Sequence, residues 1–186
     1  MFRYIIFILL FSIENNFNQS NFYYSNTGTI LFRSEAQQEL IKASSSDLIG
    51  LLDIQKKTFI FKVIIRTFHG FNSALQQEHF NEKYLESEKF PEAYFNGKII
   101  EDADLSVDGT YDLRAKGKLQ IHGVEMERII RSKAVVKNNI ITLESQFSIL
   151  LSDHSIKIPK IVHEKIASEI IVVIKIELIR KDKIEN

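Results

Sequence analysis

The five histidines are the side chains in this sequence best suited to hold a metal ion or to move a proton. They are His69, His79, His122, His154 and His163, and no two of them stand two or four residues apart. Those are the spacings at which a strand or a helix offers two imidazoles to one metal ion. Residues 162–165, VHEK, begin like the His-Glu pair of zinc proteases but lack the second histidine. The spacing therefore predicts surface or structural histidines and no metal site.

The residue types of a hydrolytic triad also occur, but only as sequence neighbours. Ser152, Asp153, His154 and Ser155 follow one another, whereas a triad needs a base that reaches the nucleophile from elsewhere in the fold. The sequence contains no nucleophile elbow and no Gly-rich phosphate loop. The adjacent carboxylates at 101–102 stand in a predicted turn and indicate solvation. We therefore expect a protein that is not an enzyme and uses no cofactor.

Composition narrows the range of partners. Lys+Arg and Asp+Glu number 24 each, so the chain has no basic excess that would hold nucleic acid. The absence of cysteine excludes disulfides, thiolate metal sites and cysteine nucleophiles. Phe is frequent, at 14 residues, and Trp is absent, which suits the lining of an apolar cavity and an ordinary core equally well. We expect no nucleic-acid partner.

The first residues are typical of a secretion leader. Arg3 gives a positive start, and the run from Tyr4 to Ile13 is almost wholly apolar. A helix needs roughly 20 apolar residues to span a bilayer, so this run is short enough for the hydrophobic region of a signal peptide. We predict a signal peptide over residues 1–20 and one mature domain over 21–186, in the periplasm or secreted. An uncleaved anchor and a buried first strand are the alternatives.

Alternation of apolar and polar residues dominates the mature chain and predicts antiparallel strands with one wet face. The clearest case is 110–121, where odd positions are apolar or small and even positions are mostly charged. Strands are predicted at 27–34, 35–43, 48–54, 58–68, 93–100, 110–121, 125–136, 140–151 and 168–180. Turn residues at 108–109, 122–123 and 138–139 separate neighbouring runs. About eight or nine strands with short links favour an up-and-down meander, closed into a barrel or packed as a sandwich.

One segment interrupts the strands. Ser73 and Gln76 form the S-x-x-Q pattern of a capping box, and the stretch that follows, up to Leu85, reads as a short helix. Phe80 and Tyr84 stand four residues apart and therefore share one face of that helix. The barrel itself can be filled or hollow, because about eight strands are just wide enough to pack with side chains or to hold one ligand. Periodicity leaves both alternatives open.

Four motifs in order resemble a known family. They are FHGF at 68–71, the segment 76–87, the segment 89–99 with its FPEAYFNGKI, and GKLQIHGV at 117–124. Together they resemble the YceI-like family, the lipocalin-like polyisoprenoid-binding proteins, over roughly residues 27–180. The resemblance implies an all-β, eight-stranded antiparallel barrel with a short helical insertion. It also implies a tunnel that holds a polyisoprenoid, quinone or similar lipid for transport or storage. The stretch 153–156 departs from the family pattern, because Ser155 stands where the family has glycine.

The resemblance locates the expected ligand-binding residues. The apolar lining is expected from Phe59, Phe61, Val63, Phe95, Leu113, Leu119, Phe147 and Ile149. Phe80 and Tyr84 are expected over the barrel mouth, with Arg66, His79 and Asn81 as polar contacts near a head group. His79 and Asn81 instead anchor the helix if they follow the usual role of buried polar groups. The expected partners are a long-chain lipid, a membrane in transient contact, and a second copy in a homodimer. The alternative is a structural or interaction module with a filled core.

Overall fold

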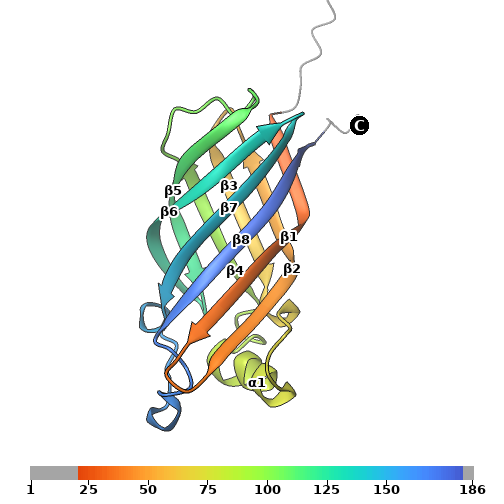
Figure 1. Ribbon diagram of the computed structural model, residues 1–186. Helices are drawn as coiled ribbons and strands as arrows, with labels where there is room; N and C mark the ends of the chain where they lie inside the picture. The colour runs from red at the N-terminus through yellow and green to blue at the C-terminus, as the bar shows by residue number, and fades with distance from the viewer. Residues whose placement is uncertain (1–20, 182–186) are drawn as a thin grey trace, which may run out of the picture.

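Eight antiparallel strands close into one barrel (Figure 1). The structure is a computed structural model that describes residues 21–181, so the expected signal peptide lies outside the described residues. Each strand pairs with the next along the chain, and the last pairs with the first. The strands are β1 (Phe22–Glu35), β2 (Leu40–Asp53), β3 (Thr58–Ile64), β4 (Glu92–Ile99), β5 (Gly109–Ile121), β6 (Val124–Lys137), β7 (Ile140–Leu150) and β8 (Glu169–Arg180). The expected all-β antiparallel barrel is confirmed.

Short helices lie in the connections. They are η1 (Ile65–Thr67), α1 (Ala74–His79), η2 (Phe80–Tyr84), η3 (Leu151–His154) and η4 (Lys160–Val162). The helix α1 lies at one end of the barrel, here named the helix end; the end at which β1 begins and β8 finishes is the terminal end (Figure 1). Within the described residues, every helix is too short or too polar to cross a membrane.

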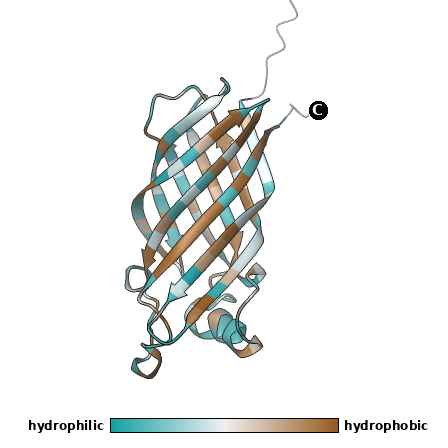
Figure 2. Ribbon diagram, viewed as in Figure 1, coloured by the Kyte–Doolittle hydropathy of each residue, from teal (hydrophilic) through white to brown (hydrophobic). Residues whose placement is uncertain are grey.

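The wall of the barrel shows the alternation that the sequence predicts (Figure 2). Bands of apolar and polar residues follow one another along the strands, as expected when one face of each strand is dry and the other is wet. The tight turns at 122–123 and 138–139 both have positive φ at their two central residues, between 51° and 73°. This is the backbone of a type I′ turn, whose twist matches that of a hairpin.

Two of the predicted strands, 35–43 and 48–54, overlap the single strand β2, which begins only at Leu40 because residues 36–39 form the β1–β2 connection. A β-bulge at residues 46–47 separates them. Before the bulge, Ala43 and Ser45 are buried, and after it Leu48 and Leu52 are buried, so the inward side changes from odd to even positions. A bulge adds one residue to one strand and so reverses the alternation downstream. The prediction was therefore wrong here because the periodicity breaks in the middle of one continuous strand.

The neighbouring strand β1 carries a compensating bulge. Between the pairs Ser25↔Gly50 and Gly28↔Leu48, β1 has one extra residue, and beyond them β2 has the extra residue, so the original register returns. A serine stands at each irregularity. Ser25 Oγ accepts a hydrogen bond from the amide two residues later at 3.4 Å, and Ser45 Oγ does the same at 3.1 Å. Each serine hydroxyl therefore accepts a hydrogen bond from a backbone amide at a place where the pairing between the strands is irregular.

The strand predicted at 58–68 is shorter in the structure. β3 ends at Ile64, and Ile65–Thr67 form the 3-10 turn η1. The next residues lead to α1, whose first turn Ser73 caps by accepting a hydrogen bond from the Gln76 amide at 3.2 Å. The Gln76 carboxamide accepts from the Asn72 amide rather than from Ser73. The capping box is thus half formed, and it fixes where the helical insertion begins.

The interior of the terminal half is filled with apolar side chains. Tyr23, Leu52 and Ile176 are each at most 1% exposed. Ile176 occupies space that inward-facing glycines leave free: its Cδ1 lies 2.7 Å from the position a Cβ would take on Gly28 and 2.9 Å from that on Gly50. A larger side chain at either glycine would overlap Ile176. The glycines of β1 and β2 therefore make room for an isoleucine from β8.

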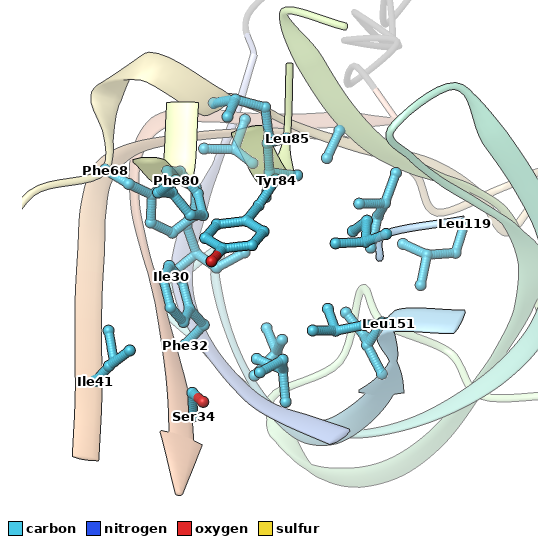
Figure 3. A pocket seen from close by; sticks show the side chains of 18 of the residues that line it. Ile30, Phe32, Ser34, Ile41, Phe68, Phe80, Tyr84, Leu85, Leu119 and Leu151 are labelled. Atoms are coloured by element: carbon cyan, nitrogen blue, oxygen red, sulfur yellow. The ribbon is translucent and has the colours of Figure 1, made fainter. Parts of the chain in front are cut away.

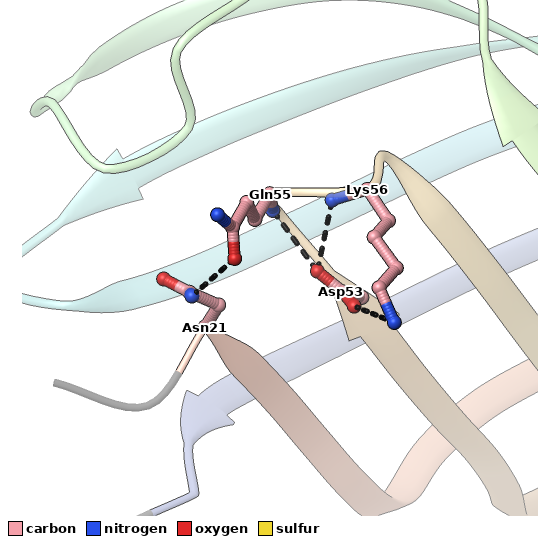
Figure 4. A network of polar contacts seen from close by, with 4 residues as sticks. All are labelled: Asn21, Asp53, Gln55 and Lys56. Atoms are coloured by element: carbon pink, nitrogen blue, oxygen red, sulfur yellow. Dashed lines mark hydrogen bonds and ion pairs between the residues drawn. The ribbon is translucent and has the colours of Figure 1, made fainter. Parts of the chain in front are cut away.

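A polar network lies at the β2–β3 turn, at the terminal end of the barrel (Figure 4). Asp53 Oδ1 accepts hydrogen bonds from the amides of Gln55 at 3.0 Å and Lys56 at 2.9 Å. Asn21 Nδ2 donates to Gln55 Oε1 at 2.8 Å and so ties the start of β1 to the same turn. A carboxylate that accepts from the amides two and three residues later is a local turn former.

β4 and β5 approach each other unusually closely at one pair of residues. Gly97 and Gly117 are register partners. A Cβ on Gly97 would overlap the carbonyl oxygen of Lys116, and a Cβ on Gly117 would overlap that of Asn96. Because the obstacle is backbone on both sides, neither position has room for a side chain.

β6 and β7 pair over only part of their length. Their ladder joins 133–137 to 140–144, near the terminal end. Nearer the helix end, the Arg128 guanidinium donates a hydrogen bond to the carbonyl of Ser148 at 2.7 Å. Arg128 stands two residues before the buried Ile130 on β6, so both lie on the inward face of that strand. A side chain therefore bridges the two strands where their backbones do not pair.

Candidate functional site

The helix half of the barrel encloses a cavity of about 510 Å³. This volume lies within the range of roughly 300–1,000 Å³ typical of pockets that bind small organic molecules. All eight strands contribute to its lining, together with the helical insertion and the connection between β7 and β8. Figure 3 shows Ile30, Phe32, Leu119 and Leu151 around the cavity, with their apolar side chains directed into it.

Phe61 borders this cavity on the side of the filled terminal half, with Ile176 of the filled core beside it. Phe61 lines the cavity, and its Cε1 lies 2.7 Å from the position a Cβ would take on Gly50. Ile176 reaches the same point from β8 and belongs to the filled core. Because Ile176 is buried in the filled core, we infer that the cavity ends beside Phe61 on the terminal side.

Four phenylalanines pack together where the helical insertion meets the barrel. Phe80 stacks on Phe32 of β1, with ring centroids 5.3 Å apart and an interplanar angle of 15°. Phe71 and Phe68 lie 5.0 and 5.8 Å from Phe80 between centroids. Offset and tilted aromatic contacts of this kind stabilise a fold by about 0.5–1.5 kcal/mol each beyond the area that they bury. The insertion is therefore attached to the barrel by aromatic packing at the edge of the cavity.

Tyr84 brings a polar group into the apolar part of the site. Its ring extends into the cavity from η2 (Figure 3). Burial raises the pKa of the Tyr84 phenol, so the hydroxyl is protonated at neutral pH and available as a hydrogen-bond donor. Around the mouth, Gln76 Nε2 donates to Glu39 Oε1 at 2.5 Å, and both residues line the cavity. Tyr84, Gln76 and Glu39 therefore place polar groups at the helix end of the site.

Most of the residues expected at the site line this cavity. They are Phe61, Val63, His79, Phe80, Tyr84, Phe95, Leu119, Phe147 and Ile149. His79 stands at the mouth, where its Nε2 lies 2.8 Å from Lys83 Nζ. Parity along the strands identified the inward face correctly for the six of these positions that lie on strands.

Four expected residues lie outside the cavity lining, each for a physical reason. Phe59 and Leu113 face inward but belong to the filled core, because parity tells the face of a strand and not the height along the barrel. Arg66 points to solvent and forms an ion pair with Glu88 at 3.0 Å. Asn81 donates through Nδ2 to the Gln77 carbonyl at 3.0 Å and so anchors the junction of α1 and η2. This contact agrees with the alternative expectation that Asn81 anchors the helix.

Sequence reasoning missed part of the lining. Ile30 and Phe32 line the cavity from β1, at even positions that face inward only after the bulge. The cavity is also lined from β8 by Ile170, Val172 and Ile174. The alternation showed that these residues face inward, but it could not show how far along the barrel they lie. Leu151, Ile156, Val162, Lys165 and Ile166 line it from the β7–β8 connection. That connection has no regular alternation, so nothing in its sequence indicated a place beside the cavity.

The comparisons with known proteins agree with this architecture. The family model for the YceI-like domain matches residues 17–178. The chain belongs to this family. A comparison with curated protein sequences gave no match.

Solved structures similar to this YceI-like chain share its fold at low sequence identity. A polyisoprenoid binding domain from Saccharophagus degradans, implicated in plant cell wall breakdown, has a TM-score of 0.73 at 12% identity. The match covers 88% of this chain and 100% of that domain. BcnA from Burkholderia cenocepacia gives 0.67 at 12% identity, with 81% and 95% covered. The YCEI protein of Campylobacter jejuni gives 0.55 at 14% identity, with 75% and 81% covered. The expected family resemblance and fold are thus confirmed.

Two histidines of this YceI-like domain connect elements at the helix end. His122, in the β5–β6 turn, has Nε2 at 2.6 Å from Glu86 Oε2 and Nδ1 at 3.1 Å from the carbonyl of His154. His154 in turn has Nδ1 at 3.1 Å from the Val124 carbonyl. Burial lowers the pKa of His154 below its usual value, which keeps the ring neutral. In the described chain, no group of three or more His, Cys, Asp or Glu side chains is arranged to hold a metal ion.

Proposed function

We propose that this protein binds one long apolar molecule, such as a polyisoprenoid, a quinone or a similar lipid, in the helix half of its barrel. Its role would be transport or storage of that molecule in the periplasm or outside the cell, and not catalysis. The observation that carries the proposal is the division of the interior into a filled terminal half and a hollow, apolar helix half. The similarity to the polyisoprenoid binding domain of S. degradans supports the class of ligand.

The driving force is transfer of the ligand's hydrocarbon out of water. Each buried methylene stabilises the complex by about 0.8 kcal/mol, whichever apolar side chain it meets. A group about the size of a water molecule takes up ~30 Å³. At ~30 Å³ for each carbon with its hydrogens, the cavity of about 510 Å³ has room for roughly 17 such carbons, or about three isoprene units. A longer chain cannot be buried whole, so its remaining part projects through the mouth.

The polar end of the ligand belongs at the mouth. Tyr84 offers a neutral phenol as hydrogen-bond donor, and Gln76, Glu39 and His79 lie on the same side of the cavity. In the opposite direction the cavity ends beside Phe61, at the filled core that contains Ile176. A few polar groups at one end of an otherwise apolar pocket fix orientation while leaving the tail weakly discriminated. We therefore place the head group at the helix end.

Extraction of the bound lipid tests the proposal directly. The protein is purified without detergent and extracted with organic solvent, and mass spectrometry of the extract is expected to show one class of long-chain lipid. A fluorescent fatty probe is expected to bind the delipidated protein. Ala115→Phe fills the cavity from β5 and should abolish probe binding, because Ala115 lines it. Lys116→Phe, the adjacent exposed residue, serves as the control. An empty extract with no probe binding by a folded protein would contradict the proposal.

The alternative from the sequence is a module with a filled core. A filled core describes the terminal half of the barrel and not the helix half.

A second partner, another copy of the chain, is proposed from the outer wall, where a row of apolar side chains crosses five neighbouring strands. The row is Ile140, Ile179, Tyr24, Leu51 and Ile60, in register from β7 to β3. Sedimentation equilibrium of the wild type and of Ile179→Asp tests this homodimer, and a monomeric wild type would contradict it.

A further inference from the structure

The connection between β7 and β8 projects beyond the strand ends at the helix end of the barrel (Figure 1). Ile161, within η4, is 92% exposed, more than any other large apolar side chain of the described residues. The segment holds this position by its own hydrogen bonds, from the amides of Val162 to Pro159 at 3.0 Å and of Lys165 to Val162 at 2.9 Å. An apolar side chain is thus presented to solvent by an ordered turn.

Residues 157–166, here named the rim loop, carry an excess of positive charge. Lys157, Lys160 and Lys165 are exposed, and in the part of the chain that the structure describes none of them forms an ion pair. The single acid of the loop, Glu164, already accepts a hydrogen bond from the Gln38 side chain. Three lysines against one carboxylate give the rim loop a net charge of +2.

The wall of the barrel differs in this respect. Several of its lysines pair with acids across strands: Lys118 lies 2.7 Å from Glu125, and Lys175 lies 2.9 Å from Glu144. Both ion pairs raise the pKa of the lysine concerned, through the hydrogen bond to the carboxylate first. The charges of these wall lysines are therefore balanced within the protein, whereas the three lysines of the rim loop face solvent.

The rim loop also borders the cavity. Val162, Lys165 and Ile166 line the mouth from this loop, so its inner side faces the cavity and its outer side faces solvent. On the insertion, Leu75 in the first turn of α1 is 58% exposed at the same end of the barrel. Figure 1 shows α1 and the loop both beyond the ends of the strands. Exposed apolar side chains thus occur on both sides of the opening.

We infer that this end of the barrel docks on an anionic lipid surface, through the rim loop and the first turn of α1, with the cavity mouth against the bilayer. An isoleucine among unpaired lysines is the combination that inserts at the boundary of head groups and acyl chains while neutralising anionic head groups. The inference rests on the proposed function for its purpose, since the ligand would pass between bilayer and cavity. Docking itself requires no ligand.

Co-sedimentation of the full protein with vesicles tests the docking. We expect binding to vesicles of phosphatidylcholine and phosphatidylglycerol in equal parts, much weaker binding to pure phosphatidylcholine, and a decline with salt. Each lysine near an anionic surface strengthens binding about fivefold, so Lys157→Gln/Lys160→Gln should weaken it roughly 30-fold. Ile161→Asp should weaken it as well. The controls are Lys133→Gln/Lys137→Gln and Ile129→Asp, at exposed positions of the wall on β6.

Equal losses in the rim-loop and wall variants would overturn the inference, as would equal binding to both kinds of vesicle. Its failure is distinguishable from failure of the proposed function. A rim-loop variant that still binds the fluorescent fatty probe is folded and has its cavity, so intact probe binding by a protein that binds no vesicles refutes docking alone. Conversely, Ala115→Phe should lose the probe and keep the vesicles; wild-type protein that binds vesicles and never binds the probe refutes the cavity function alone.

Discussion

Replacing Ile176 by alanine should lengthen the ligand that the barrel accepts. Ile176 is 1% exposed, comes from β8, and fills the space left by Gly28 and Gly50 directly beside Phe61, which borders the cavity. The change removes three carbons from the boundary between the filled and hollow halves. The cavity should then extend towards the terminal end, because the glycines below cannot refill that space.

The cost and the gain can both be estimated from these three carbons. At about 0.8 kcal/mol for each buried carbon, the lost transfer energy is about 2.4 kcal/mol, and an unfilled cavity brings the total destabilisation to about 2–5 kcal/mol. A ligand tail that enters the new space recovers about 2.4 kcal/mol, which corresponds to roughly 50-fold in affinity for a chain three carbons longer.

Native mass spectrometry of delipidated protein with a series of fatty chains measures this shift, and urea unfolding measures the stability. Leu178→Ala is the matched control, because Leu178 is fully buried in the filled core and loses the same three carbons. It should destabilise the protein similarly and leave the preferred chain length unchanged. An unchanged preference in a folded Ile176→Ala protein would show that Ile176 does not set the end of the cavity.

Further predictions concern the wall, the mouth and pH. Gly117→Ala should destabilise the barrel by about 1–3 kcal/mol in urea unfolding, since its Cβ meets the Asn96 carbonyl; a neutral result would refute the close approach. Tyr84→Phe should weaken probes with a polar head about tenfold and alkane-like probes hardly at all, from a donated hydrogen bond of about 1.5 kcal/mol. Equal weakening of both would contradict this role. Because burial lowers the pKa of His154 in the fold, the unfolded chain binds more protons, so stability should fall as pH drops below about 6.5. Urea midpoints between pH 7 and 5 should fall less in His154→Gln, and parallel curves would refute the assignment.

The wall of the barrel could be predicted because each strand separates water from an apolar interior. In β5, charged residues such as Arg114 and Lys118 alternate with Leu113 and Leu119, and this pattern indicates a strand with one dry face and one wet face. The turns could also be predicted, since Asn138 and Gly123 tolerate the positive φ that a type I′ turn requires. Local chemistry was sufficient wherever the structure repeats regularly.

The division of the interior could not be predicted, because it depends on heights that only the closed barrel defines. Ala115 leaves space at the cavity, while Ile176 fills space beside Gly28, and these residues come from β5, β8 and β1. The alternation of apolar and polar residues predicts only that each of these residues faces the interior. Phe59 and Phe61 show this plainly: two residues apart on one face, one is packed in the core and the other borders the cavity.

The paired bulges of β1 and β2 tie the lengths of these two strands together. The extra residue in β1 shifts the ladder by one, and the extra residue in β2 shifts it back. Losing either residue alone would leave a one-residue difference in length between the two strands that nothing compensates. Losing both would keep every inward residue inward. Insertions and deletions in this hairpin should therefore accumulate in pairs during evolution, so that relatives with a straight β1 also have a straight β2.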